Sequence, residues 1–294
     1  MNISGYFAKL FVAGVMGILL ATSVYAQDKP LTLKVYTGSE NGFLVTSTLV
    51  MGEKDAILID GQFNFSNAHR VVADVLESGR VLRTVYVTHA HPDHYFGLDV
   101  IKRAFPQARL VAKAYTVAEL KKTAQKKIDT WSPRLGTNGP KAVAIPDLLA
   151  QDFLELEGRR LEVIGPVQGD DGKNSVLWIP SIKALVAGDT VFGGVHAWTA
   201  DSNAEQRKTW IKTLDRLEAM APQTVVPGHY RAGTPMDASA IRYTRDYLQA
   251  FDQTAATATN GAELIAALRK RFPDATLGAA LEIGAKVNKG EMKW

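Results

Sequence analysis

The sequence of 294 residues contains no cysteine. Disulfide bonds, thiolate metal ligands and a cysteine nucleophile are therefore excluded, and the fold must be stabilised by its core and by any bound metal. The excess of basic over acidic residues is also small, with a formal net charge of +4, and no basic patch is interleaved with aromatic residues. We therefore do not expect nucleic acid as a partner.

Long apolar runs are scarce as well. One apolar stretch, from Leu10 to Ala21, follows Lys9, but it is too short for a membrane span. Val24-Tyr25-Ala26 then provides a cleavage site before Gln27. This pattern predicts a signal peptide over residues 1–26, with a retained anchor as the alternative. We expect a periplasmic or secreted protein without stable membrane insertion after cleavage.

Histidine is scarce, yet three of the six histidines fall in His89-Ala90-His91-Pro92-Asp93-His94. This cluster follows residues 81–87, an apolar run of branched and aromatic residues that predicts a buried strand. Ligands at the end of a strand converge on one point while the strand keeps them rigid. The cluster therefore predicts a metal site. Imidazole and carboxylate ligands suit zinc, with iron or manganese as alternatives.

The rest of the chain alternates between strand and helix patterns. Strands are expected at 31–36, 43–51, 56–60, 109–112, 153–156, 160–164, 175–179, 184–187 and 224–226. Helices are expected from Ser66 or Asn67 to Ser78, from about Tyr95 to Phe105, at 204–220, around 241–251 and at 262–271. Residues 114–150, which include a lysine-rich helix, form an expected insertion over the site. This order suggests two sheets packed face to face, with helices outside.

Three later segments each place a possible ligand after a strand. They are Asp170 in Gly169-Asp170-Asp171-Gly172, Asp189 in Ala187-Gly188-Asp189-Thr190, and His229 in Pro227-Gly228-His229-Tyr230. Together with the histidine cluster, in this order, they resemble the metallo-β-lactamase fold superfamily from about Leu31 to Tyr230. The resemblance implies a four-layer αββα sandwich, an α/β fold with a site for one or two metal ions, most commonly zinc.

The resemblance also implies a role for each residue. His89 and His91 would hold the first metal, Asp93, His94 and His229 the second, and Asp189 would bridge both. Asp60 would steady the ligand loop. One position departs from the pattern, because the usual third histidine of the first site falls on Asp170. Either Asp170 completes that site, or Asp171 does so in a shifted register, or the position is weak or empty.

A metal pair generates a hydroxide nucleophile at neutral pH, and Asp93 or Asp189 would accept and deliver the proton. These residues predict an exported hydrolase of an ester, lactone or related small-molecule bond, with no organic cofactor. Asp189 stands where the known β-lactamases of the superfamily have cysteine or serine, so β-lactam hydrolysis is the less favoured alternative. A mononuclear iron enzyme similar to persulfide dioxygenases and a non-catalytic metal-binding protein are further alternatives.

Several residues are candidates for the substrate pocket. His196 and Trp198 follow a Gly-Gly pair, while Phe63, Phe65, Trp131 and Tyr230 are candidates for an apolar wall. Ordinary packing is the alternative for each of them. The lysines from Lys121 to Lys127 either attract anionic substrates or form a solvated face. We predict a catalytic domain over 27–232 and a C-terminal helical extension over 233–294 packed on it. The oligomeric state is not predicted.

Overall fold

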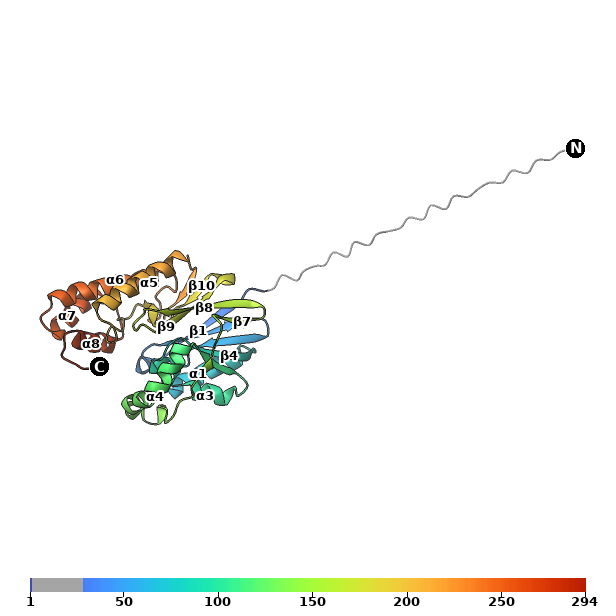
Figure 1. Cartoon of the computed structure of the whole chain (residues 1–294), viewed down its shortest axis with the longest axis horizontal. Helices are drawn as coiled ribbons and strands as arrows, with labels where there is room; N and C mark the ends of the chain where they lie inside the picture. Colours follow the sequence, from blue (N-terminus) through green and yellow to red (C-terminus); the bar gives the residue numbers. More distant parts are fainter. Residues whose placement is uncertain (2–28) are drawn as a thin grey trace.

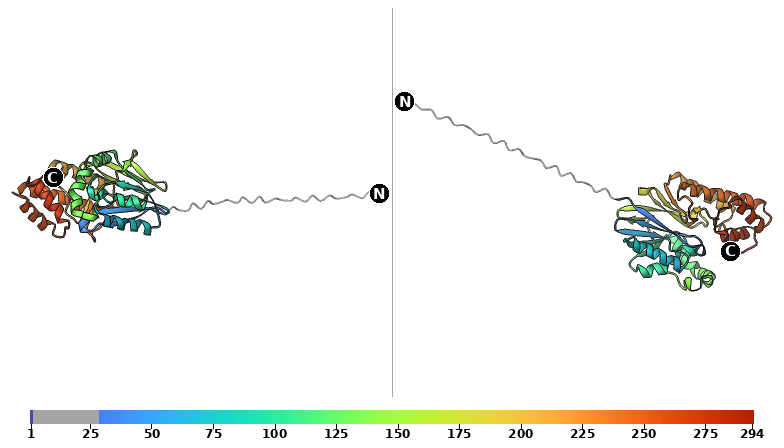
Figure 2. Two further views of the ribbon diagram at one scale, coloured as in Figure 1. Left: turned by 90° about the horizontal axis from the view of Figure 1, so that it is seen from below. Right: turned by 180° about the vertical axis from the view of Figure 1, so that it is seen from behind.

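The computed structural model describes Met1 and residues 29–294, so the predicted signal peptide, apart from Met1, lies outside the described residues. Two sheets pack face to face, and helices cover the outer face of each (Figures 1 and 2). Helices α1, α3 and α4 lie beside the first sheet, and α5 to α8 lie on the other side of the sandwich. The predicted four-layer αββα fold is confirmed.

The first sheet has the strand order β1-β2-β3-β4-β5-β6. Its strands are β1 (Thr32–Thr37), β2 (Thr46–Met51), β3 (Asp55–Ile59), β4 (Val81–Val87), β5 (Arg109–Ala112) and β6 (Asp147–Leu148). The first three strands pair antiparallel, and β3 to β6 pair parallel. The carboxyl ends of β3, β4 and β5 therefore meet at one edge of the sheet.

The second sheet has the order β12-β10-β9-β8-β7, and β11 pairs with β13 beside it. The strands are β7 (Phe153–Leu156), β8 (Arg159–Val167), β9 (Asn174–Ile179), β10 (Ala184–Val186), β11 (Phe192–Gly193), β12 (Thr224–Val226) and β13 (His229–Tyr230). Between the sheets, Ile57 and Tyr86 from the first sheet share a buried cluster with Leu161 and Leu177 from the second. This apolar layer fixes the two sheets relative to each other.

The helices are α1 (Phe65–Glu77), α2 (Pro92–Tyr95), α3 (Leu98–Ala104), α4 (Ala114–Leu135), α5 (Ala204–Ala219), α6 (Ala238–Thr257), α7 (Gly261–Arg271) and α8 (Gly278–Asn288). Short 3₁₀ turns lie at Glu40–Gly42, Gly136–Asn138, Pro180–Ile182 and Gly188–Thr190. Helix α4 is the expected lysine-rich helix of the insertion. Among the described residues, no helix combines the length and the apolarity that crossing a membrane requires.

Two predicted helix boundaries are wrong. Helix α1 begins earlier than expected, because the Asn64 carboxamide oxygen accepts the Asn67 backbone N–H at 2.9 Å and so caps the helix. The helix expected from about Tyr95 to Phe105 is two helices, α2 and α3, joined at Gly97. At Gly97 the chain passes so close to Gly61 that a Cβ atom would lie 2.1 Å from the Gly61 carbonyl oxygen.

Candidate metal centre

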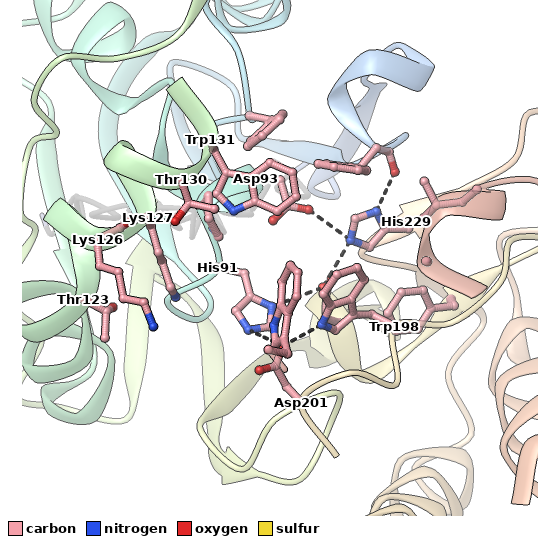
Figure 3. A pocket seen from close by; sticks show the side chains of 18 of the residues that line it. His91, Asp93, Thr123, Lys126, Lys127, Thr130, Trp131, Trp198, Asp201 and His229 are labelled. Carbon is pink, nitrogen blue, oxygen red and sulfur yellow. Dashed lines mark hydrogen bonds and ion pairs between the residues drawn. The ribbon is translucent and has the colours of Figure 1, made fainter. Parts of the chain in front are cut away.

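The candidate centre lies where strands of both sheets end at the same edge. The histidine cluster begins two residues after β4, Asp189 follows β10, and His229 follows β12 by way of Pro227-Gly228. The loop between β8 and β9 adds Asp170. Helix α2 begins at Pro92, which lets Asp93 and His94 turn back toward the strand ends. The sandwich thus brings together segments that are more than a hundred residues apart in sequence (Figure 3).

The side chains form two groups whose possible ligand atoms lie within 4.8 Å of one another. The first group is His89, His91, Asp170 and Asp189, and the second is Asp93, His94, Asp189 and His229. All seven residues proposed as ligands are therefore gathered here. Asp189 belongs to both groups, with Oδ2 lying 3.6 Å from His89 Nε2 and 3.1 Å from His229 Nε2. This position suits a carboxylate that bridges two ions.

Asp170, rather than Asp171, faces the first group. The Asp170 side chain is fully buried, and its Oδ2 lies 2.9 Å from His91 Nδ1. Its Oδ1 accepts hydrogen bonds from the Asp171 backbone N–H and from the Asn174 carboxamide. Asp171 Oδ2 lies 3.9 Å from the other nitrogen of His91 and is partly exposed. The geometry therefore favours Asp170 as the fourth member of the first group.

Asp60 holds the ligand loop from behind. Its backbone has a positive φ of 63°, which aims the side chain at the loop after β4. Oδ1 accepts the Thr88 backbone N–H at 2.9 Å, and Oδ2 accepts both the Thr88 hydroxyl and His94 Nδ1–H. The Thr88 Oγ1 in turn accepts His89 Nδ1–H at 2.9 Å. Both imidazoles thereby carry their proton on Nδ1 and present Nε2 to the centre.

His229 is oriented by a backbone carbonyl group, whose role cannot be predicted from the type of residue that carries it. The Phe43 carbonyl oxygen accepts His229 Nδ1–H at 2.7 Å, so Nε2 faces the carboxylates of Asp93 and Asp189. Gly228 allows this approach, because a Cβ atom there would lie 2.2 Å from Asp189 Oδ1. The Gly-His motif therefore reflects a steric requirement as well as a ligand.

The charges in the centre are strongly coupled. Burial lowers the pKa of His91, but Asp170 and Asp201 together raise that pKa to about 10. Burial likewise lowers the pKa of His229, while Asp189 and Asp93 raise it to about 10. Burial raises the pKa of Asp93, but His94 and His229 lower it to about 2. The carboxylates of the centre are therefore stabilised by nearby positive charge, which either protons on the histidines or metal cations can supply.

The chemistry of the donor set fits metal ions. His89 Nε2, His94 Nε2, Asp170 Oδ2 and Asp189 Oδ1 are buried and make no well-aligned hydrogen bond in the described part of the chain. Asp170 Oδ2 and Asp189 Oδ1 each lie within 3.0 Å of a histidine nitrogen, so these atoms face one another as ligands of a cation do. Burying such atoms unpaired is costly, and atoms aimed at a common point are satisfied by coordination of a cation. Imidazole nitrogens with carboxylate oxygens match zinc best, and iron and manganese also accept this set.

A pocket of about 490 Å³ opens in front of the centre (Figure 3). Phe63, Trp131 and Trp198 line it, as expected, together with His91, Asp93, Asp189 and His229. Phe65 and Tyr230 do not line it, and their assignment to the wall is wrong. The Tyr230 hydroxyl instead donates to the Thr234 carbonyl oxygen at 2.7 Å, which turns the ring away from the cavity.

His196 is also absent from the pocket wall, so its assignment there is wrong. It is 2% exposed, and its Nδ1 lies 3.2 Å from the Tyr247 hydroxyl of α6. Burial, together with the charge of Arg269, lowers the pKa of His196 to about 4. It is a neutral core histidine that packs between the second sheet and the C-terminal helices.

Other residues of the pocket were not predicted. Trp294, Lys293 and Phe43 line it, and so does Asp201, whose Oδ2 lies 3.6 Å from His91 Nε2. Trp198 Nε1–H donates to the same oxygen of Asp201 at 2.6 Å. No motif marks these residues, because they reach the pocket only through the folding of distant loops. Lys126 and Lys127 also line the pocket, and the lysine-rich run in the sequence had marked them as possible contacts for an anionic substrate.

Comparison with known proteins agrees with this geometry. Two curated relatives are hydroxyacylglutathione hydrolases, one from Aliivibrio salmonicida at 28% identity over 187 residues and one from Chromohalobacter salexigens at 26% over 167 residues. The matches cover 62% and 55% of this chain. The chain spans only 61% and 54% of the length of these relatives.

Similar solved structures include a metallo-beta-lactamase from Pontibacter korlensis, with a TM-score of 0.57 and 21% identity, covering 75% of this chain and 95% of that one. The DIM-1 metallo-beta-lactamase has a TM-score of 0.53 and 20% identity, covering 76% and 99% of the two chains. At this identity the likeness shows the fold. The sequence model of the metallo-beta-lactamase superfamily matches residues 41–229, which is more than half of the sequence. The chain belongs to the metallo-beta-lactamase superfamily.

Proposed function

We propose that this protein is an exported metal-dependent hydrolase that cleaves an ester, thioester or lactone bond in a small molecule. One observation carries the proposal: seven imidazole and carboxylate side chains form two ligand groups that share Asp189 at the floor of a pocket. The similarity to hydroxyacylglutathione hydrolases supports a hydrolytic activity. Export rests on the pattern of residues 1–26 alone.

Bound zinc ions would supply Lewis acidity and lower the pKa of water toward neutrality. His89, His91 and Asp170 would hold the first ion, and Asp93, His94 and His229 the second, with Asp189 between them. Asp60, Thr88 and the Phe43 carbonyl fix the imidazole tautomers, which aligns the ligands before substrate arrives.

Asp93 is the residue best placed to move a proton. Its carboxylate lines the pocket and is 9% exposed, whereas Asp189 is 1% exposed. His94 and His229 lower the pKa of Asp93 to about 2, so its carboxylate is ionised at neutral pH. Although such a carboxylate is a weak base, its Oδ2 can accept a hydrogen bond from the nucleophile and take up its proton as the nucleophile attacks. It can then deliver that proton to a leaving group in the same pocket.

The three alternatives are less well supported. A non-catalytic protein was suggested by the replacement of a histidine by Asp170, yet Asp170 occupies the fourth place of the first group. Asp189 in the bridging position favours esters, thioesters and lactones over β-lactams. A mononuclear iron oxygenase needs only one metal ion, so it does not account for the second group of possible ligands.

The test is a panel of para-nitrophenyl esters, thioesters, lactones, a phosphodiester and a β-lactam, assayed with the zinc-loaded mature protein. We expect turnover of an ester, thioester or lactone, and a loss of at least about a thousandfold in His91→Ala. His69→Ala is the matched control, because His69 is exposed on α1 outside the pocket, and it should retain the wild-type rate. No turnover of any substrate, or oxygen consumption by an iron-loaded form, would refute the hydrolase.

A further inference from the structure

The pocket has an aromatic wall that is broad and nearly continuous. The Trp294 ring lies between two other indoles, with centroids 6.2 Å from Trp131 and 5.0 Å from Trp198. Trp131 also packs edge-on against Phe63 and Phe43, at 5.6 Å and 5.5 Å. Such a wall provides a large apolar contact for a flat group of a ligand. The cavity of about 490 Å³ limits that ligand to a small molecule.

Helix α4 contributes a wall of different character. Thr123, Lys126, Lys127 and Thr130 line the pocket, and their spacing of three and four residues places them on one face of the helix. In Figure 3 the two lysine side chains extend from α4 toward the side of the pocket where His91 lies. Lys121 and Lys122 of the same helix are exposed and do not line the pocket. Lys122 lies one turn before Lys126 on the same side of α4, beyond the pocket, whereas Lys121 projects from a different side of the helix.

The pocket lysines form no close ion pair with another described residue. Among residues 29–294, neither Lys126 nor Lys127 has a carboxylate within 4.0 Å, whereas Lys113 and Lys173 each pair with one. The Lys127 ammonium instead donates to the Ala90 carbonyl oxygen, in the loop between the first two histidines. Burial lowers the pKa of Lys127, and the more distant charges of Asp201, Asp171, Glu119 and Asp93 offset part of that effect. A half-buried ammonium without an ion pair favours an anionic ligand.

We infer that the substrate of the proposed hydrolase is an amphipathic anion, with a flat apolar body against the tryptophans and a carboxylate bound by Lys126 and Lys127. This inference deepens the proposed function and rests on it for the identity of the bond cleaved. The α4 insertion therefore acts as the specificity element of the pocket.

The kinetic test uses two para-nitrophenyl esters of one biphenyl acid, which differ only in a distal carboxylate or carboxamide. The wild type should have the higher kcat/KM for the carboxylate ester. Lys126→Met should lower the carboxylate-to-carboxamide ratio of kcat/KM about fivefold, as expected for a partly exposed ion pair. Lys121→Met, which removes an exposed lysine on a different side of α4, is the matched control and should leave the ratio unchanged. Equal ratios in the wild type and Lys126→Met would overturn the inference.

A binding test separates this inference from the proposed activity. The ester bond is replaced by an amide, and quenching of tryptophan fluorescence reports the Kd of the carboxylate and carboxamide ligands for the zinc-loaded protein. We expect tighter binding of the carboxylate, and a Kd about fivefold higher in Lys126→Met. Charge-selective binding without ester turnover would refute the hydrolase alone and support the anion site. Equal affinities for the two ligands, or the same effect from Lys121→Met, would overturn the anion site.

Lys127 requires one more measurement, because it also contacts the ligand loop. Lys127→Met should weaken the carboxylate ligand at an unchanged zinc content, measured by mass spectrometry. A loss of zinc together with equal weakening of both ligands would assign Lys127 to the support of the metal loop and leave no anion site at that residue.

Discussion

The buried Asp60 carboxylate is the hydrogen-bond acceptor for three neighbouring donors. It is 3% exposed and accepts hydrogen bonds from the Thr88 backbone, the Thr88 hydroxyl and His94. Removing it leaves three buried donors without partners. Because His89 hydrogen-bonds to the same Thr88 hydroxyl, the effect reaches the first ligand group as well.

We predict that Asp60→Ala lowers the free energy of unfolding by about 2 to 4 kcal/mol. Asp60→Asn should cost less, because asparagine tolerates the positive φ and still accepts the His94 proton. Urea denaturation of the chelator-treated proteins measures both, so that metal binding does not contribute. Equal stability of Asp60→Ala and the wild type would contradict the role assigned to this carboxylate.

Asp170 is the residue at which this chain departs from the usual ligand set. Asp170→Asn keeps the shape of the side chain and the hydrogen bond from the Asp171 backbone, but removes the charge that faces His91. We predict that zinc content falls from two ions to about one per chain, because a neutral amide is a weaker ligand. Asp171→Asn is the control and should retain both ions. The reverse pattern would show that the register of this loop is shifted by one.

The protonation of His91 and His229 predicts how pH affects metal binding. Both pKa values are raised to about 10, so both imidazoles carry an extra proton at pH 7 in protein stripped of metal. A metal needs the neutral imidazole, so its binding must release these protons, and the affinity must fall as pH falls. Calorimetry in buffers of different ionisation enthalpy should show release of more than one proton per chain at pH 7. A binding enthalpy that is independent of the buffer would contradict this protonation state.

The sequence was sufficient to predict which side chains gather at the candidate centre, since His89, His91, Asp93 and His94 lie within six positions after one strand. It was not sufficient for groups that act through the backbone or through distant packing. The Phe43 carbonyl that orients His229 has no side-chain signature. His196 lies near the pocket in sequence, yet its ring packs on Tyr247 in the core, which only the path of α6 determines.

At the scale of elements, the C-terminal helices share a core with the second sheet. Phe251 and Leu248 of α6 are fully buried. They lie in one apolar cluster with Val225 of β12 and Leu281 of α8. The Arg207 guanidinium of α5 lies 5.0 Å from the centre of the Phe251 ring. These contacts favour a single folding unit over a loosely attached extension. The boundary at residue 232 remains a prediction.

We predict that Phe251→Ala destabilises the whole protein by about 3 to 5 kcal/mol in a single unfolding transition. Leu76→Ala is the control, because Leu76 is 66% exposed on α1, and it should change stability by less than about 0.5 kcal/mol. Denaturation followed by both circular dichroism and tryptophan fluorescence tests cooperativity. Two separate transitions would show that residues 233–294 fold independently.

Strand and helix patterns predicted most elements because burial and periodicity are local properties of the sequence. Strand β4 and helix α4 are examples, with buried runs and helical spacing that are visible without the fold. Helix α8 was missed. It begins at Gly278 without a side-chain cap, after Leu277 in the left-handed conformation, so no capping motif marks its start. The split between α2 and α3 was missed because the close approach of Gly97 to Gly61 is a tertiary contact.

At the scale of the whole molecule, the sandwich places one ligand set at the meeting edge of two sheets. The first sheet contributes the loop after β4, and the second contributes the residues around β9, β10 and β12. Neither sheet alone holds a complete group, because Asp189 of the second sheet belongs to both. Helix α4 and the C-terminal residues then enclose the pocket from opposite sides of the sandwich. Metal binding should therefore depend on the correct packing of both sheets.

The most direct test is the number of zinc ions bound per chain, measured by mass spectrometry after equilibrium dialysis, in the wild type and in Asp189→Ala. The wild type should bind two ions, and Asp189→Ala fewer than one, because both groups lose the shared carboxylate. Circular dichroism of the two proteins serves as the check of folding. A wild type that binds no zinc, or a folded Asp189→Ala that still binds two ions, would contradict a two-metal centre bridged by Asp189.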